Sequence, residues 1–138
     1  MQTNELILLE NRFGLFFNLP PVFNKIPNLS ELPKKRKTRE QAYVFALMIA
    51  QRHLNLANDN PLNLREHEGN AADYFLYAGA LAELLHRDKD AGRAYKLTAD
   101  YHANIEFSEE IRKRGIKIMK RKSILSRTRE FLRDYIGL

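Results

Sequence analysis

The segment from residue 70 to residue 98 constrains the fold more than any other part of the chain, because the start signal of a helix is followed there by the signals of a turn and a strand. Asn70 is a residue type that caps helices, and Asp73 would stand in the first turn, where a carboxylate favours the positive end of the helix dipole. We therefore expect a helix over residues 71–86. Its apolar positions recur at helical spacing and comprise Tyr74, Tyr77 or Ala78, Leu81, Leu84 and Leu85.

A β-hairpin is expected directly after this helix. Residues 88–92, Asp-Lys-Asp-Ala-Gly, have the composition of a turn. Residues 93–97 alternate with a period of two, which places Tyr95 and Leu97 on one face of a strand. That strand would pair back on a first strand that begins with the leucine pair at 84–85. The segment thus predicts a helix that leads into two short strands and a loop.

Two further helices are predicted before this segment. Thr38 and Gln41 have the spacing of a capping box, and apolar residues then recur at helical spacing until the pattern ends near Pro61. Residues 62–69 predict a short helix that a left-handed turn at Gly69 would close. The predicted order of the central part is therefore helix, short helix, helix, hairpin.

The first part of the chain, residues 1–37, is expected to be an extended arm. Its prolines remove backbone donors and disfavour helical conformation in the residues before them. Large aromatic side chains would anchor the arm to the core or to a second copy of the protein, since such side chains are usually buried. The prolines are Pro20, Pro21, Pro27 and Pro33, and the aromatic anchors are Phe13, Phe16, Phe17 and Phe23.

The last part of the chain, residues 101–138, predicts additional helices. Ser108 and the two glutamates after it favour a helix start, and that helix would end near Lys120. A final helix is expected from about Ser123 to Tyr135, with an apolar face that would pack on the core or on a dimer partner. Because a chain of 138 residues fits one domain, we divide it into an arm (1–37), a core (38–100) and C-terminal helices (101–138) of one domain.

The core resembles winged-helix domains found in bacteria, including those fused to restriction-type endonucleases. In that group a third helix of the form Ala-Asp-Tyr-Tyr leads to a leucine pair and to Gly-x-x-Tyr-x-Leu-Thr. Residues 72–75, 84–85 and 92–98 of this chain match those motifs, with phenylalanine in place of the second tyrosine. The resemblance implies a mainly α fold with a small β-hairpin, a winged helix-turn-helix. It also implies binding to duplex DNA, with the third helix in the major groove and the hairpin on the backbone.

The third predicted helix departs from a base-reading helix in its charge. Its side opposite Tyr74 carries no lysine or arginine, and Asp73 and Glu83 are its charged residues. Base edges are usually read by arginine, lysine, asparagine or glutamine. Two interpretations follow: the carboxylates accept from cytosine amino groups, or this side packs against protein. Small residues such as Gly79 favour packing, because they allow two helices to approach closely.

Basic residues carry the main signal for a partner, since the formal net charge is +6 and the sequence pI is about 9.7. Clusters of this kind bind phosphates with little sequence preference, although a run of charges is also typical of an ordinary solvated surface. The candidate DNA-binding residues are Lys34, Lys35, Arg36, Lys37 and Arg39 in the arm and first helix, Asn70 at the third helix, Arg87, Lys89, Arg93 and Lys96 in the hairpin, and Lys120, Arg121 and Lys122 near the end.

Catalysis by this chain is not predicted. The absence of cysteine excludes disulfides, cysteine-ligated zinc and thiol catalysis. A restriction-type nuclease site would need Glu-x-Lys or Asp-x-Lys after a strand, and the chain contains neither motif. No pair of its histidines has the four-residue spacing that places two metal ligands on one helix face. We expect no catalytic residue, no metal and no cofactor.

These patterns together predict a non-catalytic winged-helix protein that binds double-stranded DNA mainly through phosphate contacts, or the DNA-recognition part of a restriction-type nuclease system. The alternative is a protein-protein interaction or dimerisation module on the same scaffold. A homodimer is expected, because a second copy would double the phosphate contacts. The first residues lack the basic region of a signal peptide and no apolar run could span a bilayer, so we expect a cytoplasmic protein with no membrane partner.

Overall fold

The computed structural model describes residues 3–17, 30 and 32–136, and it describes the side chains of residues 4–14, 30 and 32–121. Over these residues the chain is helical and contains no strand. The α-helices are α1 (Thr3–Phe17), α2 (Arg36–Asp59), α3 (Leu64–Leu84), α4 (Asp88–Tyr101) and α5 (Ile105–Ile136), and the short 3-10 helix η2 (Pro61–Asn63) joins α2 to α3.

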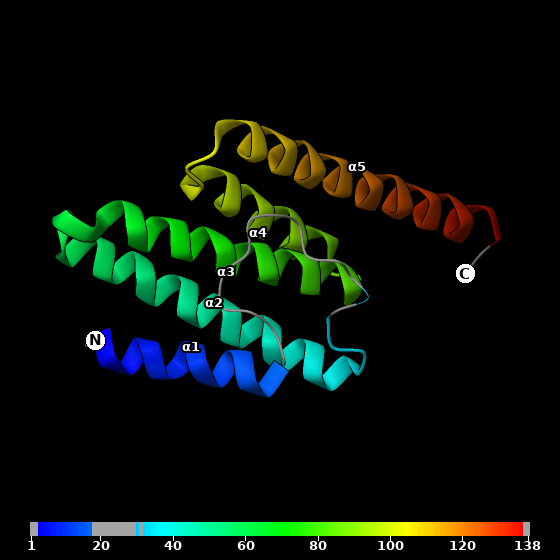
Figure 1. Ribbon diagram of the computed structural model, residues 1–138. Coiled ribbons are helices and arrows are strands. Elements are labelled where there is room, and N and C mark those ends of the chain that lie inside the picture. The colour runs from blue at the N-terminus through cyan, green and yellow to red at the C-terminus, as the bar shows by residue number, and fades with distance from the viewer. Residues whose placement is uncertain (1–2, 18–29, 31, 137–138) are drawn as a thin grey trace.

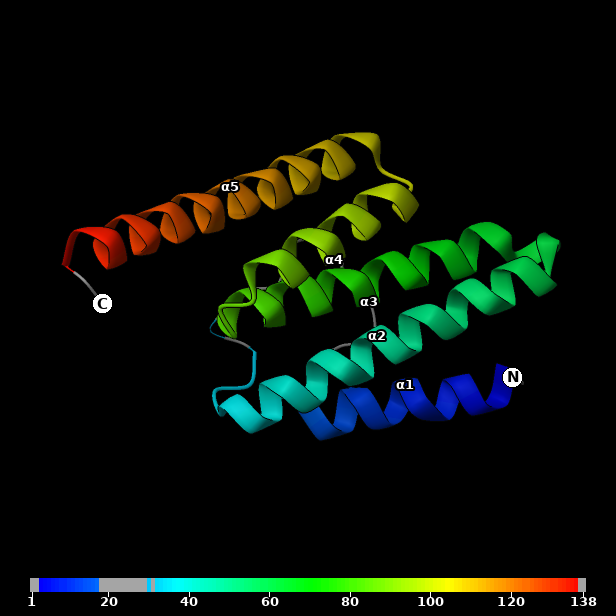
Figure 2. The ribbon, with the colours of Figure 1, turned by 180° about the vertical axis from the view of Figure 1, so that it is seen from behind.

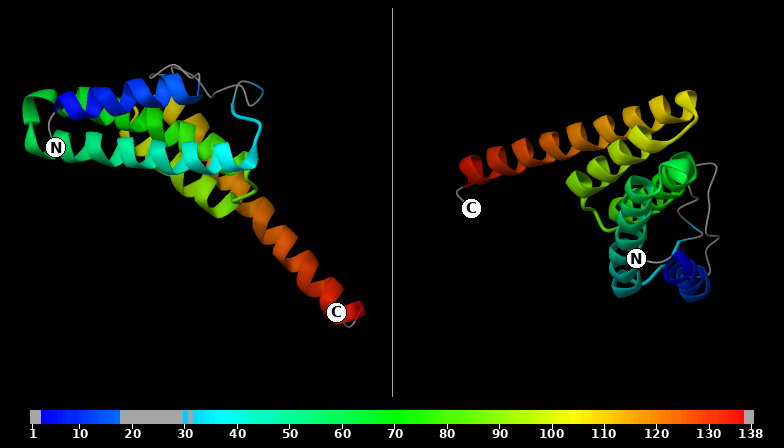
Figure 3. Two further views of the ribbon diagram at one scale, coloured as in Figure 1. Left: turned by 90° about the horizontal axis from the view of Figure 1, so that it is seen from below. Right: turned by 90° about the vertical axis from the view of Figure 1, so that its left-hand side faces the viewer.

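The helices α2, α3, α4 and α5 lie in a row in chain order, and each packs mainly on its neighbour in the sequence (Figures 1 and 2). Short connections turn each of these helices back along the one before it. Helix α1 packs on α2 at the other side of the row. The last part of α5 extends past the other helices (Figure 3). Along the direction of the helix axes, the two ends of this bundle are therefore made of helix termini and short connections.

Aromatic side chains form the core between α1, α2 and α3. The ring centroid of Phe13 lies 5.8 Å from that of Phe45, 5.5 Å from that of Tyr74 and 5.4 Å from that of Tyr77. Edge-to-face aromatic pairs at such distances are favourable beyond the area they bury. Phe13 is fully buried, so the prediction that it anchors the N-terminal part to the core is confirmed. The other predicted aromatic anchors lie outside the described side chains.

A second core joins α3, α4 and α5, with Leu76, Tyr95 and Ile111 fully buried in it. Glycines let these helices approach closely. A Cβ atom on Gly79 of α3 would lie 2.6 Å from the Tyr95 ring, and one on Gly115 of α5 would lie 3.3 Å from the Gly92 carbonyl of α4. The contacts between α3, α4 and α5 therefore depend on these small residues.

The predicted winged helix is wrong, because the residues expected to form the hairpin form helix α4. Asp88 and Asp90 occupy the first turn of α4, where acidic residues favour the helix dipole. The buried residues of α4 recur at helical spacing, whereas the period-two pattern covers only residues 93–97. They include Ala91, Ala94, Tyr95, Thr98 and Ala99.

The turn before α4 uses His86 in place of glycine. The backbone N–H of Arg87 donates to the Ala82 carbonyl over 2.9 Å, and that of His86 donates to the Glu83 carbonyl over 3.0 Å. This is the bonding of a Schellman motif, whose central residue adopts the left-handed conformation. His86 has a φ of 58°, and histidine is among the residues that tolerate such values. The leucine pair therefore ends α3 and begins no strand.

Three further expectations are corrected. Helix α3 begins at Leu64 and continues through Gly69 and Asn70, so neither the short helix with its turn nor the Asn70 cap forms. The N-terminal part contains helix α1, so it is not wholly an extended arm, and residues 18–29 lie outside the described residues. Helix α5 is one continuous helix where two were expected.

The start of α2 also differs. The helix begins at Arg36, after an N-cap residue that makes no side-chain hydrogen bond, so Thr38 caps no helix.

Candidate nucleic-acid interface

Basic residues gather at the end of the bundle where α2 and α4 begin, and we call this region the basic end. The first residues of α2 and α4 meet there, because an Nη atom of Arg87 lies 3.4 Å from a carboxylate oxygen of Glu40. Glu40 also pairs with Arg36 across one helical turn, at 3.4 Å. The basic end comprises Lys34, Lys35, Arg36, Lys37, Arg39, Arg87 and Lys89.

Most cations of the basic end are available to a ligand. Lys34, Lys35, Lys37 and Lys89 are exposed, and within the described part of the chain no ion pair involves them. Arg39 differs, because its Nε donates to the Pro33 carbonyl over 2.6 Å and so holds the segment before α2.

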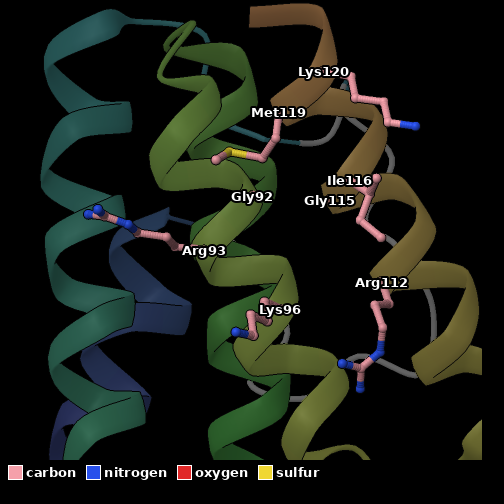
Figure 4. A pocket seen from close by; sticks show the side chains of 8 residues that line it. All are labelled: Gly92, Arg93, Lys96, Arg112, Gly115, Ile116, Met119 and Lys120. Carbon is pink, nitrogen blue, oxygen red and sulfur yellow. The ribbon is translucent and has the colours of Figure 1, made fainter. Parts of the chain in front are cut away.

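A groove of about 540 Å³ lies between α4 and α5, and we call it the basic groove. Met119 reaches from α5 to α4 at Gly92 (Figure 4), and its side chain occupies the space that a Cβ atom on Gly92 would fill. Four cationic side chains surround this apolar floor, and none of the described residues that line the groove is acidic. The lining residues are Gly92, Arg93, Lys96, Arg112, Gly115, Ile116, Met119 and Lys120.

The cationic groups of the basic groove are spread along its rim. Arg93 and Lys120 point to opposite sides of the groove (Figure 4). Arg112 lies 3.4 Å from a carboxylate oxygen of Asp100, while no ion pair of Arg93, Lys96 or Lys120 is found among the described residues. Spread, unpaired cations fit an extended polyanion better than a single small anion, because their charges do not converge on one point.

The basic end and the basic groove are continuous. Lys89 and Arg93 stand one turn apart on α4, so this helix carries the positive surface from one region to the other. Arg121 of α5 lies 3.6 Å from a carboxylate oxygen of Asp88 and joins α5 to the start of α4.

The structure therefore brings together most of the candidate residues. Asn70 lies in the first half of α3, away from the end of that helix that meets the basic end, so it does not belong to this surface. The side chain of Lys122 lies outside those described.

The acidic side of α3 packs against protein, so that interpretation is confirmed. Both guanidinium contacts of Arg114 reach Glu83, at 3.0 and 2.8 Å, and the Glu83 side chain is 10% exposed. The guanidinium carbon of Arg114 lies 5.7 Å from the centre of the Tyr95 ring. Burial raises the pKa of Tyr95, and the neighbouring Glu83 raises it further. The ion pair of Glu83 and Arg114 joins α3 to α5, so this side of α3 is packed against protein and offers no cations to DNA.

A cluster that the sequence analysis did not predict lies at α1, α2 and α3. The Nδ1 atoms of His53 and His67 are 3.1 Å apart, and His53 Nε2 lies 2.8 Å from a carboxylate oxygen of Glu10. Both histidines are buried. Each stands seven residues from Asn60, at the turn between α2 and α3, so the two positions face each other in an antiparallel helix pair. This equal spacing from the turn was the signal in the sequence that could have predicted the contact between the two histidines. No group of three or more ligands suited to a metal occurs among the described residues.

Comparison with protein-family models, curated proteins and solved structures found no match to this chain. Within the described residues, none of the helices combines the length and apolar character needed to cross a membrane.

Proposed function

We propose that this chain is a non-catalytic protein that binds double-stranded DNA, with the phosphates held by the basic end and the basic groove. The observation that carries the proposal is the gathering of lysines and arginines from α2, α4 and α5 on one continuous surface, with no acid among the described residues that line the groove. A net charge of +6 attracts a polyanion to the molecule as a whole. The basic surface concentrates the positive potential in one region, so we expect the polyanion to bind there. Contacts of this kind bind phosphates without reading sequence.

The proposal is tested by the salt dependence of binding to a short DNA duplex, measured by fluorescence anisotropy. Replacing Lys96 and Lys120 together with glutamine removes two unpaired cations of the groove. We expect the double variant to bind about tenfold more weakly at about 0.1 M salt, and its slope of log affinity against log salt to fall by about one unit for each lost contact.

Arg65→Gln is the matched control, since Arg65 is exposed at the start of α3 and lies outside both basic regions. This variant should bind as the unchanged protein does. No binding by the unchanged protein at low salt, or an equal loss in the double variant and the control, would contradict the proposal.

An acidic segment of another protein is the second candidate partner, and the apolar floor of the groove favours it. Ile116 is 52% exposed and Met119 is 40% exposed. Apolar side chains open to solvent between cations suit an amphipathic acidic helix, which would bury its own apolar residues on them. Ile116→Ser separates the two candidates: binding of an acidic helical peptide should weaken several-fold, whereas duplex binding should keep its affinity and its salt slope. Equal losses for peptide and DNA would argue that both occupy one site.

A homodimer and a cytoplasmic location remain predictions that accompany this proposal. The expected link to restriction-type nucleases depended on the hairpin motif, and it is not part of the proposal because those residues form α4. Sedimentation of the chain with and without duplex would show whether a second copy takes part.

A further inference from the structure

The two lysines before α2 lie in a segment that is held at three points. Leu32 is 3% exposed and packs in the core that α1, α2 and α3 share. The Pro33 carbonyl accepts a hydrogen bond from Nε of Arg39 over 2.6 Å. The Lys35 carbonyl accepts one from the backbone N–H of Arg39 over 2.9 Å. Arg39 therefore bonds on both sides of Lys34, once with its side chain and once with its backbone.

The side-chain bond of Arg39 restricts a torsion that the rest of the segment leaves free. Proline fixes its own φ, so the direction of the Pro33 carbonyl depends mainly on ψ. The residue before a proline favours extended conformations, which leaves Leu32 little freedom. The backbone bond at Lys35 belongs to the first turn of α2 and does not need the arginine side chain. The bond from Nε to the Pro33 carbonyl, which we call the brace, therefore orders the backbone that enters Lys34.

The ordered segment presents cations that can bind a ligand. Lys34 and Lys35 are exposed, and no ion pair involves either of them among the side chains that the structure describes. The next cation, Arg36, is paired with Glu40 at 3.4 Å. Ordering a backbone segment costs conformational entropy, and a segment that is already ordered avoids part of this cost when it binds.

We infer that Arg39 is a positioning residue of the basic end, whose side chain orders the segment that presents Lys34 and Lys35 to phosphates. The inference rests on the proposed function for its ligand. It assigns Arg39 a role that differs from the direct phosphate contact expected from the sequence.

A brace and a direct contact differ in whether lysine can replace the arginine. In Arg39→Lys the positive charge that a phosphate needs is kept. A carbon atom of lysine, however, stands where Nε stands in arginine, so the hydrogen bond to the Pro33 carbonyl is lost. A direct contact would therefore tolerate this substitution better than the brace does.

Backbone relaxation of the isotope-labelled chain without DNA tests whether the brace orders the segment. We expect the order parameter of the Lys34 amide to be about 0.85 in the unchanged protein and below about 0.6 in Arg39→Lys. The amides in the middle of α2 should keep their values in both proteins. An order parameter of Lys34 that is the same in the two proteins would overturn the inference.

A double-mutant cycle on duplex binding tests whether Arg39 acts through the two lysines. Arg39→Lys is introduced into the unchanged chain and into a chain that already carries Lys34→Gln and Lys35→Gln, and affinity is measured by fluorescence anisotropy at about 0.1 M salt. We expect a loss of about fivefold in the first chain and of less than about twofold in the second. Equal losses in the two chains, or no loss in the first, would contradict the positioning role.

Arg52→Lys is the matched control, because Arg52 is also partly buried and lies in the second half of the same helix, away from the basic end. It should change neither duplex affinity nor the order parameter of Lys34. A loss equal to that of Arg39→Lys would mean that exchanging arginine for lysine in α2 weakens binding without the brace, which would overturn the inference.

The variant that lacks Lys96 and Lys120 separates a failure of this inference from a failure of the proposed function. If the unchanged protein binds duplex and the groove variant binds more weakly, while the cycle shows no coupling, the inference alone is wrong. If the unchanged protein binds no duplex at low salt, the proposed function is wrong, and the role of Lys34 and Lys35 as phosphate contacts is wrong with it.

Discussion

Gly79→Ala is expected to destabilise the protein by about 1–2 kcal/mol, although alanine is the better helix former. The added Cβ atom would lie 2.6 and 2.7 Å from two carbons of the Tyr95 ring. That ring is fully buried and has Arg114 above it, so it cannot move aside freely. Overpacking of this kind costs about 1–3 kcal/mol or more, against a gain of about 1 kcal/mol from helix propensity. Urea denaturation followed by circular dichroism measures the difference.

Gly69→Ala is the matched control on the same helix. Apart from the adjoining residues and backbone of its own helix, no atom lies within 4 Å of a Cβ built on Gly69, so the helix propensity acts alone there. This variant should be more stable than the unchanged protein by about 0.5–1 kcal/mol. If alanine stabilised the chain equally at both glycines, Tyr95 would not cover Gly79, and the close packing of α4 on α3 would be wrong.

Asp73→Asn is expected to stabilise the protein at pH 8 by on the order of 2 kcal/mol. Asp73 is 6% exposed, and burial raises the pKa of its carboxyl to about 7. Between the ordinary pKa of aspartate and about pH 7, the folded state therefore holds a proton that the unfolded state has already lost. The associated stability is fully present below the ordinary pKa of aspartate, and it is lost as the pH rises through about 7. Asparagine has nearly the same shape and carries no charge to bury.

The pH dependence distinguishes this effect from a simple change in packing. The advantage of Asp73→Asn should be largest at pH 8, smaller at pH 6 and close to zero at pH 4, measured by urea denaturation at each pH. Asp59→Asn is the control, since Asp59 is exposed and its stability change should stay within about 0.5 kcal/mol and show no such trend. An advantage of the same size at pH 4 and pH 8 would show that the Asp73 carboxyl is not ionising in a buried position.

The prediction of a hairpin failed because two periodicities overlap in the same few residues. Tyr95 and Leu97 fit an alternating strand, but Tyr95 also fits a helical stripe with Ala91 and Thr98, which are buried. A pattern of five residues cannot separate these possibilities, since the difference emerges only over several turns. The boundary between α3 and α4 was missed because the residue with positive φ there is His86, whereas glycine or asparagine usually marks such a turn.

Other features could be predicted because they depend on local chemistry. The small residues and carboxylates on one side of α3 indicated packing, and Gly79 and Glu83 do pack against α4 and α5. The burial of Phe13 followed from its size and apolar character. The basic clusters were visible as runs of lysine and arginine, and their meeting at one end of the molecule follows from helices that the sequence pattern did not place.

Contacts between distant residues could not be predicted from single segments. Glu83 and Arg114 are 31 residues apart, and Glu10 and His53 are 43 residues apart. Each of these partners is an ordinary surface residue type until the helix packing is known. The contact between His53 and His67 differs, because the two residues are equally far from the turn between α2 and α3. Their contact could be predicted once both helices and their connection are recognised.

The central claim is that the basic end and the basic groove bind duplex DNA, and an NMR titration of the isotope-labelled chain with a short duplex tests it most directly. We expect the amide signals of residues 34–37, 89–96 and 112–120 to shift together as DNA is added, and to return as salt is raised. Signals around His53 and His67 should stay in place. Shifts confined to other surfaces, or no shift at low salt, would contradict the account.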